Sequence, residues 1–100
     1  MIKLLMSWDL KPGSESDYFD FSVREFIPGI MKLGIQPTEA WYTIFGDGPQ
    51  ILTGGIAEDL PTMQSILASN DWQQLRDKLF GYVTNFNFKI VHATGKFQLL

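Results

Sequence analysis

The chain contains no cysteine and only one histidine. The absence of cysteine excludes disulfides, thiolate nucleophiles, iron–sulfur clusters and cysteine-ligated zinc sites. A single histidine argues against a tightly bound transition metal, because such sites need several histidine or carboxylate ligands. We therefore expect neither a metal nor a cofactor.

Long hydrophobic runs are also missing from the chain. No apolar stretch approaches the roughly 18 residues that a membrane-spanning helix needs. The apolar run at the N-terminus is too short for a signal sequence. These absences predict a soluble, cytoplasmic protein without membrane contact.

Positive charge is scarce, with eight lysine and arginine residues against eleven aspartate and glutamate residues and a net charge of −3. The basic residues are scattered along the chain and form no patch in the sequence. Nucleic-acid binding relies on clustered positive charge to displace counterions from phosphates. We therefore exclude a nucleic-acid partner.

Apolar residues are plentiful, at 45% of the chain, and 14% of the residues are aromatic. A length of 100 residues is typical of one domain. We therefore treat residues 1–100 as a single domain with ample core material. The same apolar content leaves apolar side chains over for the surface.

The first half of the chain reads as a strand followed by a helix. Residues 2–10 alternate between two faces, which predicts a half-buried strand. Apolar residues at spacings of three and four, Val23 among them, predict a helix over residues 14–33. We expect a capping box that begins at Ser14 and a bend at Pro28.

The second half continues with a hairpin and another helix. Two strand-like runs, residues 38–45 and 51–57, flank a turn rich in glycine and predict the hairpin. Both faces of the first run carry apolar residues. The acids at 58–59 suit the start of a helix that continues to about residue 83, with a break and a fresh N-cap near Ser69.

The last segment, residues 86–97, alternates again and predicts a strand, so the order of elements is βαββαβ. Two right-handed crossovers around a hairpin give an α+β, ferredoxin-like domain, with a four-stranded antiparallel sheet and both helices on one face. The other face is bare. Because the hairpin strands are apolar on both sides, we expect a second copy of the chain to cover it in a homodimer.

Three segments carry a resemblance to a known superfamily: residues 26–34 of the first helix, 40–55 of the hairpin and 68–75 of the second helix. Together with the overall pattern they resemble the dimeric α/β-barrel superfamily, which includes NIPSNAP, EthD-like and antibiotic-biosynthesis-type monooxygenase proteins. The resemblance covers nearly the whole chain. It implies that two sheets face each other as a barrel, which in this group often encloses a pocket for an apolar or aromatic small molecule.

Two residues are candidates for catalysis. His92 is the only side chain that titrates near neutral pH by default, so it could act as acid or base; the alternative is a histidine that hydrogen-bonds locally near a strand end. Haem-degrading members of the resembled group have a histidine where this chain has Arg76, so haem ligation is not expected. Trp72 and Arg76 match residue types that cofactor-free monooxygenases of the group place around their pocket.

Trp41, Tyr42 and His92 are the predicted ligand-binding residues. Trp41 and Tyr42 are neighbours on one strand, so they face opposite sides and one of them points to the uncovered face. The run Thr53–Gly54–Gly55 could suggest phosphate binding, but it lacks the other glycines and the lysine of such motifs. A bulge or a close backbone approach accounts for these glycines more simply.

Our leading hypothesis from the sequence is a homodimer that binds a small apolar or aromatic molecule between its two sheets. A cofactor-independent monooxygenase-type enzyme is the alternative, with His92 or Arg76 assisting proton transfer. A structural or regulatory dimer with no pocket is the third possibility. The volume between the sheets separates them, because roughly 300 Å³ or more admits a small ligand.

Overall fold

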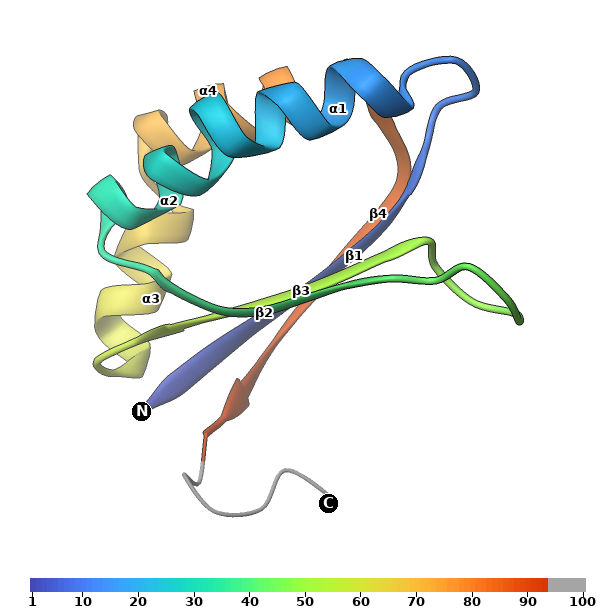
Figure 1. The fold of residues 1–100 in the computed structure, drawn as a ribbon. Helices are drawn as coiled ribbons and strands as arrows, with labels where there is room; N and C mark the ends of the chain where they lie inside the picture. The colour runs from blue at the N-terminus through green and yellow to red at the C-terminus, as the bar shows by residue number, and fades with distance from the viewer. Residues whose placement is uncertain (94–100) are drawn as a thin grey trace.

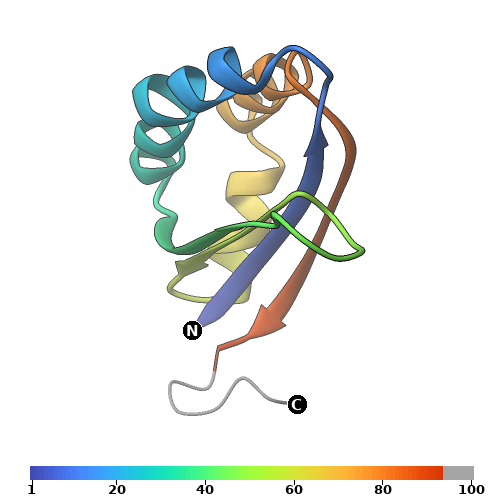
Figure 2. The ribbon, with the colours of Figure 1, turned by 45° about the vertical axis from the view of Figure 1, so that its right-hand side comes forward.

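The structure, a computed structural model, describes residues 1–93 of the chain. Its elements are β1 (Ile2–Leu10), α1 (Glu15–Phe21), η1 (Ser22–Phe26), α2 (Ile27–Leu33), β2 (Gln36–Tyr42), β3 (Ile51–Ala57), α3 (Leu60–Leu67), α4 (Asn70–Leu79) and β4 (Val83–His92). The strands form one antiparallel sheet in the order β2-β3-β1-β4. All helices lie on one face of this sheet (Figure 1), as the turned view in Figure 2 also shows. The predicted βαββαβ, ferredoxin-like architecture is confirmed.

Strand β1 lies inside the sheet, between β3 and β4, and supplies much of the core. Alternate residues of β1 face the helices and are at most 6% exposed: Ile2, Leu4, Met6, Trp8 and Leu10. Trp8 packs against Phe26 and Phe86, with ring centroids 5.8 and 5.9 Å away, and its Nε1 donates to the buried Tyr18 hydroxyl at 3.2 Å. Burial of each such large side chain stabilises the fold by about 1.5–3 kcal/mol.

The first helical segment is continuous from Glu15 to Leu33 but contains a π-helical turn, η1. The Ile27 N–H donates to the Ser22 carbonyl, five residues back. This wider turn lies just before Pro28, which has no N–H to donate. The extra residue also rotates the helix, so Tyr18 and Phe21 enter the core while Val23, expected on the buried stripe, is 70% exposed.

The helix ends follow local chemistry, with one correction. The expected capping box at Ser14 is wrong, because the Ser14 backbone is not extended (ψ 3°) and its side chain makes no cap hydrogen bond. Asp59 and Ser69 do cap their helices, accepting from the backbone N–H groups of Thr62 at 2.9 Å and Trp72 at 3.2 Å. The first segment stops at Gly34 in the left-handed conformation, with φ 105°.

Several element boundaries differ from the sequence-based expectation. Strand β2 ends at Tyr42 rather than at residue 45, because only Thr43 continues the pairing, through a bond from its N–H to the Gln50 carbonyl. Helix α4 ends at Leu79, and the chain turns directly into β4. The final strand was expected over residues 86–97; β4 starts three residues earlier, and residues 94–97 lie outside the described part.

A bulge in β4 sets which side chains of that strand face the helices. The pairing of β4 with β1 shifts by one residue between Ser7 and Asp9, and Asn85 there has a positive φ of 55°. This geometry is typical of a bulge, which adds one residue and changes the direction of the following side chains. Phe86 consequently stacks on Trp8 in the core.

Among residues 1–93, no helix combines the length and the apolar character that crossing a membrane requires.

Candidate ligand groove on the open sheet face

The face of the sheet opposite the helices is built from alternate residues of β1, β3 and β4 and from Gln36, Glu39 and Trp41 of β2. Cross-strand pairing aligns these residues in three rows across β2, β3, β1 and β4. The rows are Trp41, Leu52, Ser7 and Asn87; then Glu39, Gly54, Leu5 and Lys89; and then Gln36, Ile56, Lys3 and Val91. The open face therefore mixes apolar and charged side chains.

A groove of about 730 Å³ lies over this face and is lined by residues of all four strands. We call it the open-face groove; its side chains include Lys3, Leu5, Glu39, Trp41, Leu52, Lys89 and Val91. Trp41 is 65% exposed and Leu52 is 43% exposed, so the apolar wall is open to solvent in the single chain. The volume lies within the usual range for small-molecule sites.

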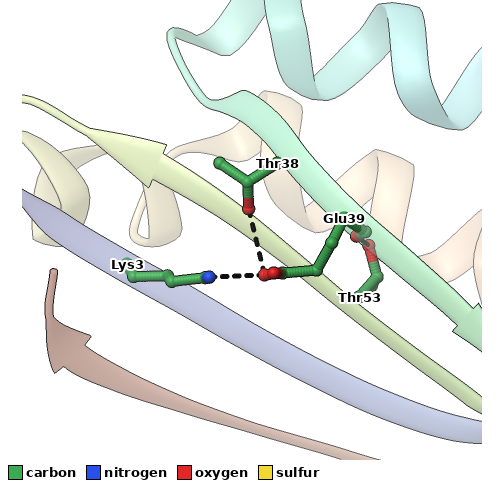
Figure 3. Close-up of polar contacts among 4 residues, drawn as sticks. All are labelled: Lys3, Thr38, Glu39 and Thr53. Carbon is green, nitrogen blue, oxygen red and sulfur yellow. Dashed lines mark hydrogen bonds and ion pairs between the residues drawn. The ribbon is translucent and has the colours of Figure 1, made fainter. Parts of the chain in front are cut away.

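An ion pair crosses the middle of the groove diagonally. Lys3 Nζ on β1 lies 2.5 Å from Glu39 Oε1 on β2, and the Thr38 hydroxyl donates to the same oxygen at 3.1 Å (Figure 3). Lys3 is the more enclosed partner, with 12% of its side chain exposed, against 37% for Glu39. Its hydrogen bond to Glu39 holds the pKa of that carboxyl below its ordinary value of 4.5, against a smaller raising effect of desolvation.

Gly54 makes this crossing possible. It lies in β3, between the strands that carry Lys3 and Glu39. A Cβ at this position would overlap the Glu39 carboxylate and would lie 2.9 Å from Cε of Lys3. The bare backbone thus leaves room for a charged pair above the centre of the sheet.

A bulge in β2 turns Glu39 toward the groove. Pro37 pairs with Gly55 and Glu39 with Gly54, so Thr38 is an extra residue on β2. Without it, Glu39 would face the helices, because each shift of one residue reverses the side-chain direction. Gly54 and Gly55 pair regularly with β1, so the bulge expected at the glycines is not there but on the neighbouring strand β2. The Thr53 hydroxyl supports this bulge by donating to the Glu39 carbonyl at 3.0 Å.

The predicted ligand-binding residues occupy different places. Trp41 lies in the groove. Tyr42 faces the helix side, where its ring packs on Phe19 with centroids 5.6 Å apart. His92 pairs with Ile2 on the helix side of the sheet but is exposed and borders the groove at the end of β4. Trp41 and His92 therefore line the same groove, whereas Tyr42 lies on the opposite face of the sheet.

Arg76, the second catalytic candidate, lies on α4 and does not line the groove. Its guanidinium lies 5.7 Å from the Phe80 ring centroid and 3.7 Å from the Asp77 carboxylate. Its Nε is buried without a hydrogen-bond partner among the described residues. Trp72 is 4% exposed and belongs to the core, as expected for an aromatic residue on a helix facing a sheet. Arg76 and His92 therefore do not share the groove.

Sequence reasoning missed the charged residues of the groove. Lys3 and Glu39 are 36 positions apart, and only the strand pairing brings them together. The available signal was a glycine inside an apolar strand, which often marks a close approach. In the described part of the chain, no three His, Asp or Glu side chains gather closely enough to hold a metal ion.

A smaller cavity, of about 260 Å³, lies between the first helical segment and β2. Trp8, Tyr18, Ser22 and Ala40 are among its lining residues. Burial raises the pKa of the Tyr18 hydroxyl, although its hydrogen bond with Trp8 acts in the opposite direction. This cavity falls below the roughly 300 Å³ typical of small-molecule sites, so the open-face groove is the better candidate.

Comparison with known proteins identifies the fold. No protein-family model and no curated protein matches the chain. A NIPSNAP-like domain protein from Burkholderia xenovorans has a TM-score of 0.71 at 21% identity, with 95% of this chain and 86% of that chain covered. An EthD-family protein from Bacillus halodurans has a TM-score of 0.72 at 9% identity, with coverage of 93% and 99%.

An antibiotic biosynthesis monooxygenase also matches, with a TM-score of 0.65 at 12% identity and coverage of 93% of this chain and 98% of that chain. At such identities the likeness is one of fold, and it extends over nearly the whole length of both chains. The resemblance predicted from the sequence is thereby confirmed. The chain has the same ferredoxin-like fold as these NIPSNAP-like, EthD-family and antibiotic biosynthesis monooxygenase proteins.

Proposed function

We propose that the chain forms a homodimer through its open sheet face and holds a small apolar or aromatic molecule between the two sheets. The observation that carries this proposal is the open-face groove of about 730 Å³ with its exposed apolar wall. Trp41 and Leu52 are neighbours across β2 and β3, and they are 65% and 43% exposed. Contiguous apolar surface of this kind favours an interaction site.

A second copy of the chain is the simplest cover for this surface. Two sheets that pack face to face lie about 10 Å apart, and the side chains of both inner faces fill the space between them. Here the space above the central Gly54 is taken by the Lys3–Glu39 pair, but a groove of about 730 Å³ still lies over each face. This supports a dimer with a pocket over a dimer with a filled interface.

The ion pair of Lys3 and Glu39 is compatible with such a covered position. A charged pair loses hydration when it is buried, and this cost is offset only with good geometry and further hydrogen bonds. Glu39 has both, through Lys3 and the Thr38 hydroxyl. We therefore expect the pair to persist inside the dimer and to form a polar floor for the ligand.

The enzyme hypothesis remains an alternative. One titratable group, His92, borders the groove. General acid–base catalysis would need this imidazole within hydrogen-bond reach of a bound substrate. The monooxygenase-type activity and the cytoplasmic location stay predictions.

The dimer is tested by sedimentation velocity at micromolar concentration and native mass spectrometry of protein purified from its own source. We expect a dimer that carries a small-molecule mass.

Leu52→Asp should yield a folded monomer, because it puts a charge on the open face. Val23→Asp, at an exposed helix position, is the matched control and should stay dimeric. A monomeric wild type at this concentration would overturn the proposal, and a dimer without any bound mass would favour the filled interface.

A further inference from the structure

The charge inside the open-face groove differs in sign from that of the whole chain. The chain has a net charge of −3. Three of the residues that line the groove carry a full charge at neutral pH, namely Lys3, Glu39 and Lys89. Lys3 and Glu39 neutralise each other in their ion pair. Lys89 is left as the remaining positive charge in the groove.

No acidic side chain of the described part pairs with Lys89. Lys89 lies on β4 opposite Leu5, whereas Glu39 lies on β2, three strand spacings or about 14 Å away. Asp9, the one acidic residue of β1, accepts hydrogen bonds from the Gln50 backbone and the Asn85 side chain. Residues 94–100 contain no aspartate or glutamate. Within residues 1–93, this lysine therefore has no acidic partner.

Closing the groove would make this unpaired charge costly. An ammonium group that loses its water without gaining a partner is strongly destabilising. A face-to-face dimer brings two copies of Lys89 toward one enclosed volume. An anionic group on the ligand would offset both the desolvation and the repulsion between the lysines.

We propose that the open-face groove binds an aromatic carboxylate, with its ring on Trp41 and Leu52 and its carboxylate on Lys89. This inference rests on the proposed function, because it names the chemical class of the molecule held between the sheets. Trp41 presents a large exposed ring to the groove, and Leu52 lies beside it. The flexible four-carbon stem of Lys89 lets its ammonium group reach inward from β4 toward a ligand that lies on this wall.

The test uses two probes with the same ring system, 2-naphthoate and the neutral 2-naphthalenemethanol. Binding is followed by isothermal titration calorimetry and by quenching of tryptophan fluorescence. We expect the wild type to bind the carboxylate at least tenfold more tightly than the alcohol, with a preference that falls as salt is added. Lys89→Met should remove this preference and leave the affinity for the alcohol within about twofold, because the ring contacts remain.

Lys78→Met is the matched control, since Lys78 lies on α4 and pairs with Glu25 outside the groove. It should leave the preference unchanged. Circular dichroism and sedimentation velocity check that both variants keep the fold and the assembly of the wild type.

The outcomes separate this inference from the proposed function. If neither probe binds the wild type, the pocket itself is wrong. If both probes bind equally, the pocket stands and the carboxylate class is wrong. If Lys89→Met keeps the preference but weakens the dimer, Lys89 pairs with an acid of the second copy, and the inference is likewise overturned.

Discussion

The two faces of the sheet are built from the same strands but hold different side chains. On the helix side of β1, every residue is apolar and at most 6% exposed. On the open side, the same strand carries Lys3, Leu5 and Ser7, none of which is fully buried. The helix side is closed by the chain itself through two covalently linked helical segments. The open side is left uncovered by residues 1–93.

This difference also appears in how each face is held together. The helix side is held by packing, with Trp8 surrounded by the rings of Tyr18, Phe26 and Phe86. The open side is organised by one ion pair above a glycine. Packed interiors resist any change of volume, whereas a polar network over a groove leaves room for another molecule. The helix side therefore supplies the packed core, and the open side is the face for which we propose binding.

The largest expected effect comes from shortening a side chain on the helix face. Leu4→Ala should lower the free energy of unfolding by about 2–5 kcal/mol, because Leu4 is fully buried and leaves a cavity. Leu5→Ala, the next residue on the opposite face, should lower it less. Its loss should shrink with dilution only if the open face is the dimer interface, because dilution dissociates both proteins into monomers. Urea unfolding at two protein concentrations measures both, and equal losses for the two variants would contradict the division of roles.

An intermediate effect is expected at Gly54. Gly54→Ala should cost about 1–3 kcal/mol, because its Cβ would push against the side chains of Lys3 and Glu39. In a Glu39→Ala background part of this cost should disappear, since the closest neighbour is gone. Urea unfolding of the four proteins of this double-mutant cycle gives the coupling. Strict additivity would show that the glycine is needed for another reason.

The smallest effect is expected from protonation of Glu39. Its lowered pKa means that the ion pair stabilises the fold above pH 4.5, its ordinary value, and that this contribution is lost as the pH falls through the lower folded-state pKa. The side chain is partly exposed, so the contribution should stay below about 1 kcal/mol. Urea unfolding of wild type and Glu39→Gln between about pH 7 and pH 3 measures it. The difference in the free energy of unfolding between the two proteins should vanish at acidic pH. A difference that grows as the pH falls would show that the ionised Glu39 does not stabilise the fold.

Much of the fold could be predicted because its signals are local. The period of two in β1, the caps at Asp59 and Ser69 and the stop at Gly34 all depend on residues within a few positions of one another. The misses came where a local irregularity altered a regular pattern. The π-helical turn moved Val23 to the surface, and the early end of β2 left Ile44 and Phe45 at least 90% exposed.

The candidate site was less predictable than the fold. The sequence showed that Trp41 and Tyr42 face opposite sides, but only the strand pairing shows that Trp41 is the one in the groove. His92 lies on the same face of β4 as Phe88 and Ile90, as expected. These three residues pair with β1 residues that face the helices, so His92 does not belong to the open face. Lys3, Glu39 and Lys89 gave no signal of their own, because isolated charges on strands are usually solvated.

The sequence by itself determined the order of the elements, the buried face of β1 and the surplus of apolar surface. These properties follow from periodicity and turn chemistry, which act over a few residues. Only the tertiary structure decided what the open face contains. Two bulges, at Thr38 and Asn85, set the direction of the side chains on β2 and β4, and the pairing of distant strands brings Lys3 to Glu39 across Gly54. Side-chain direction in a sheet reverses with each single-residue shift, so it depends on contacts between strands that no one segment of the chain encodes.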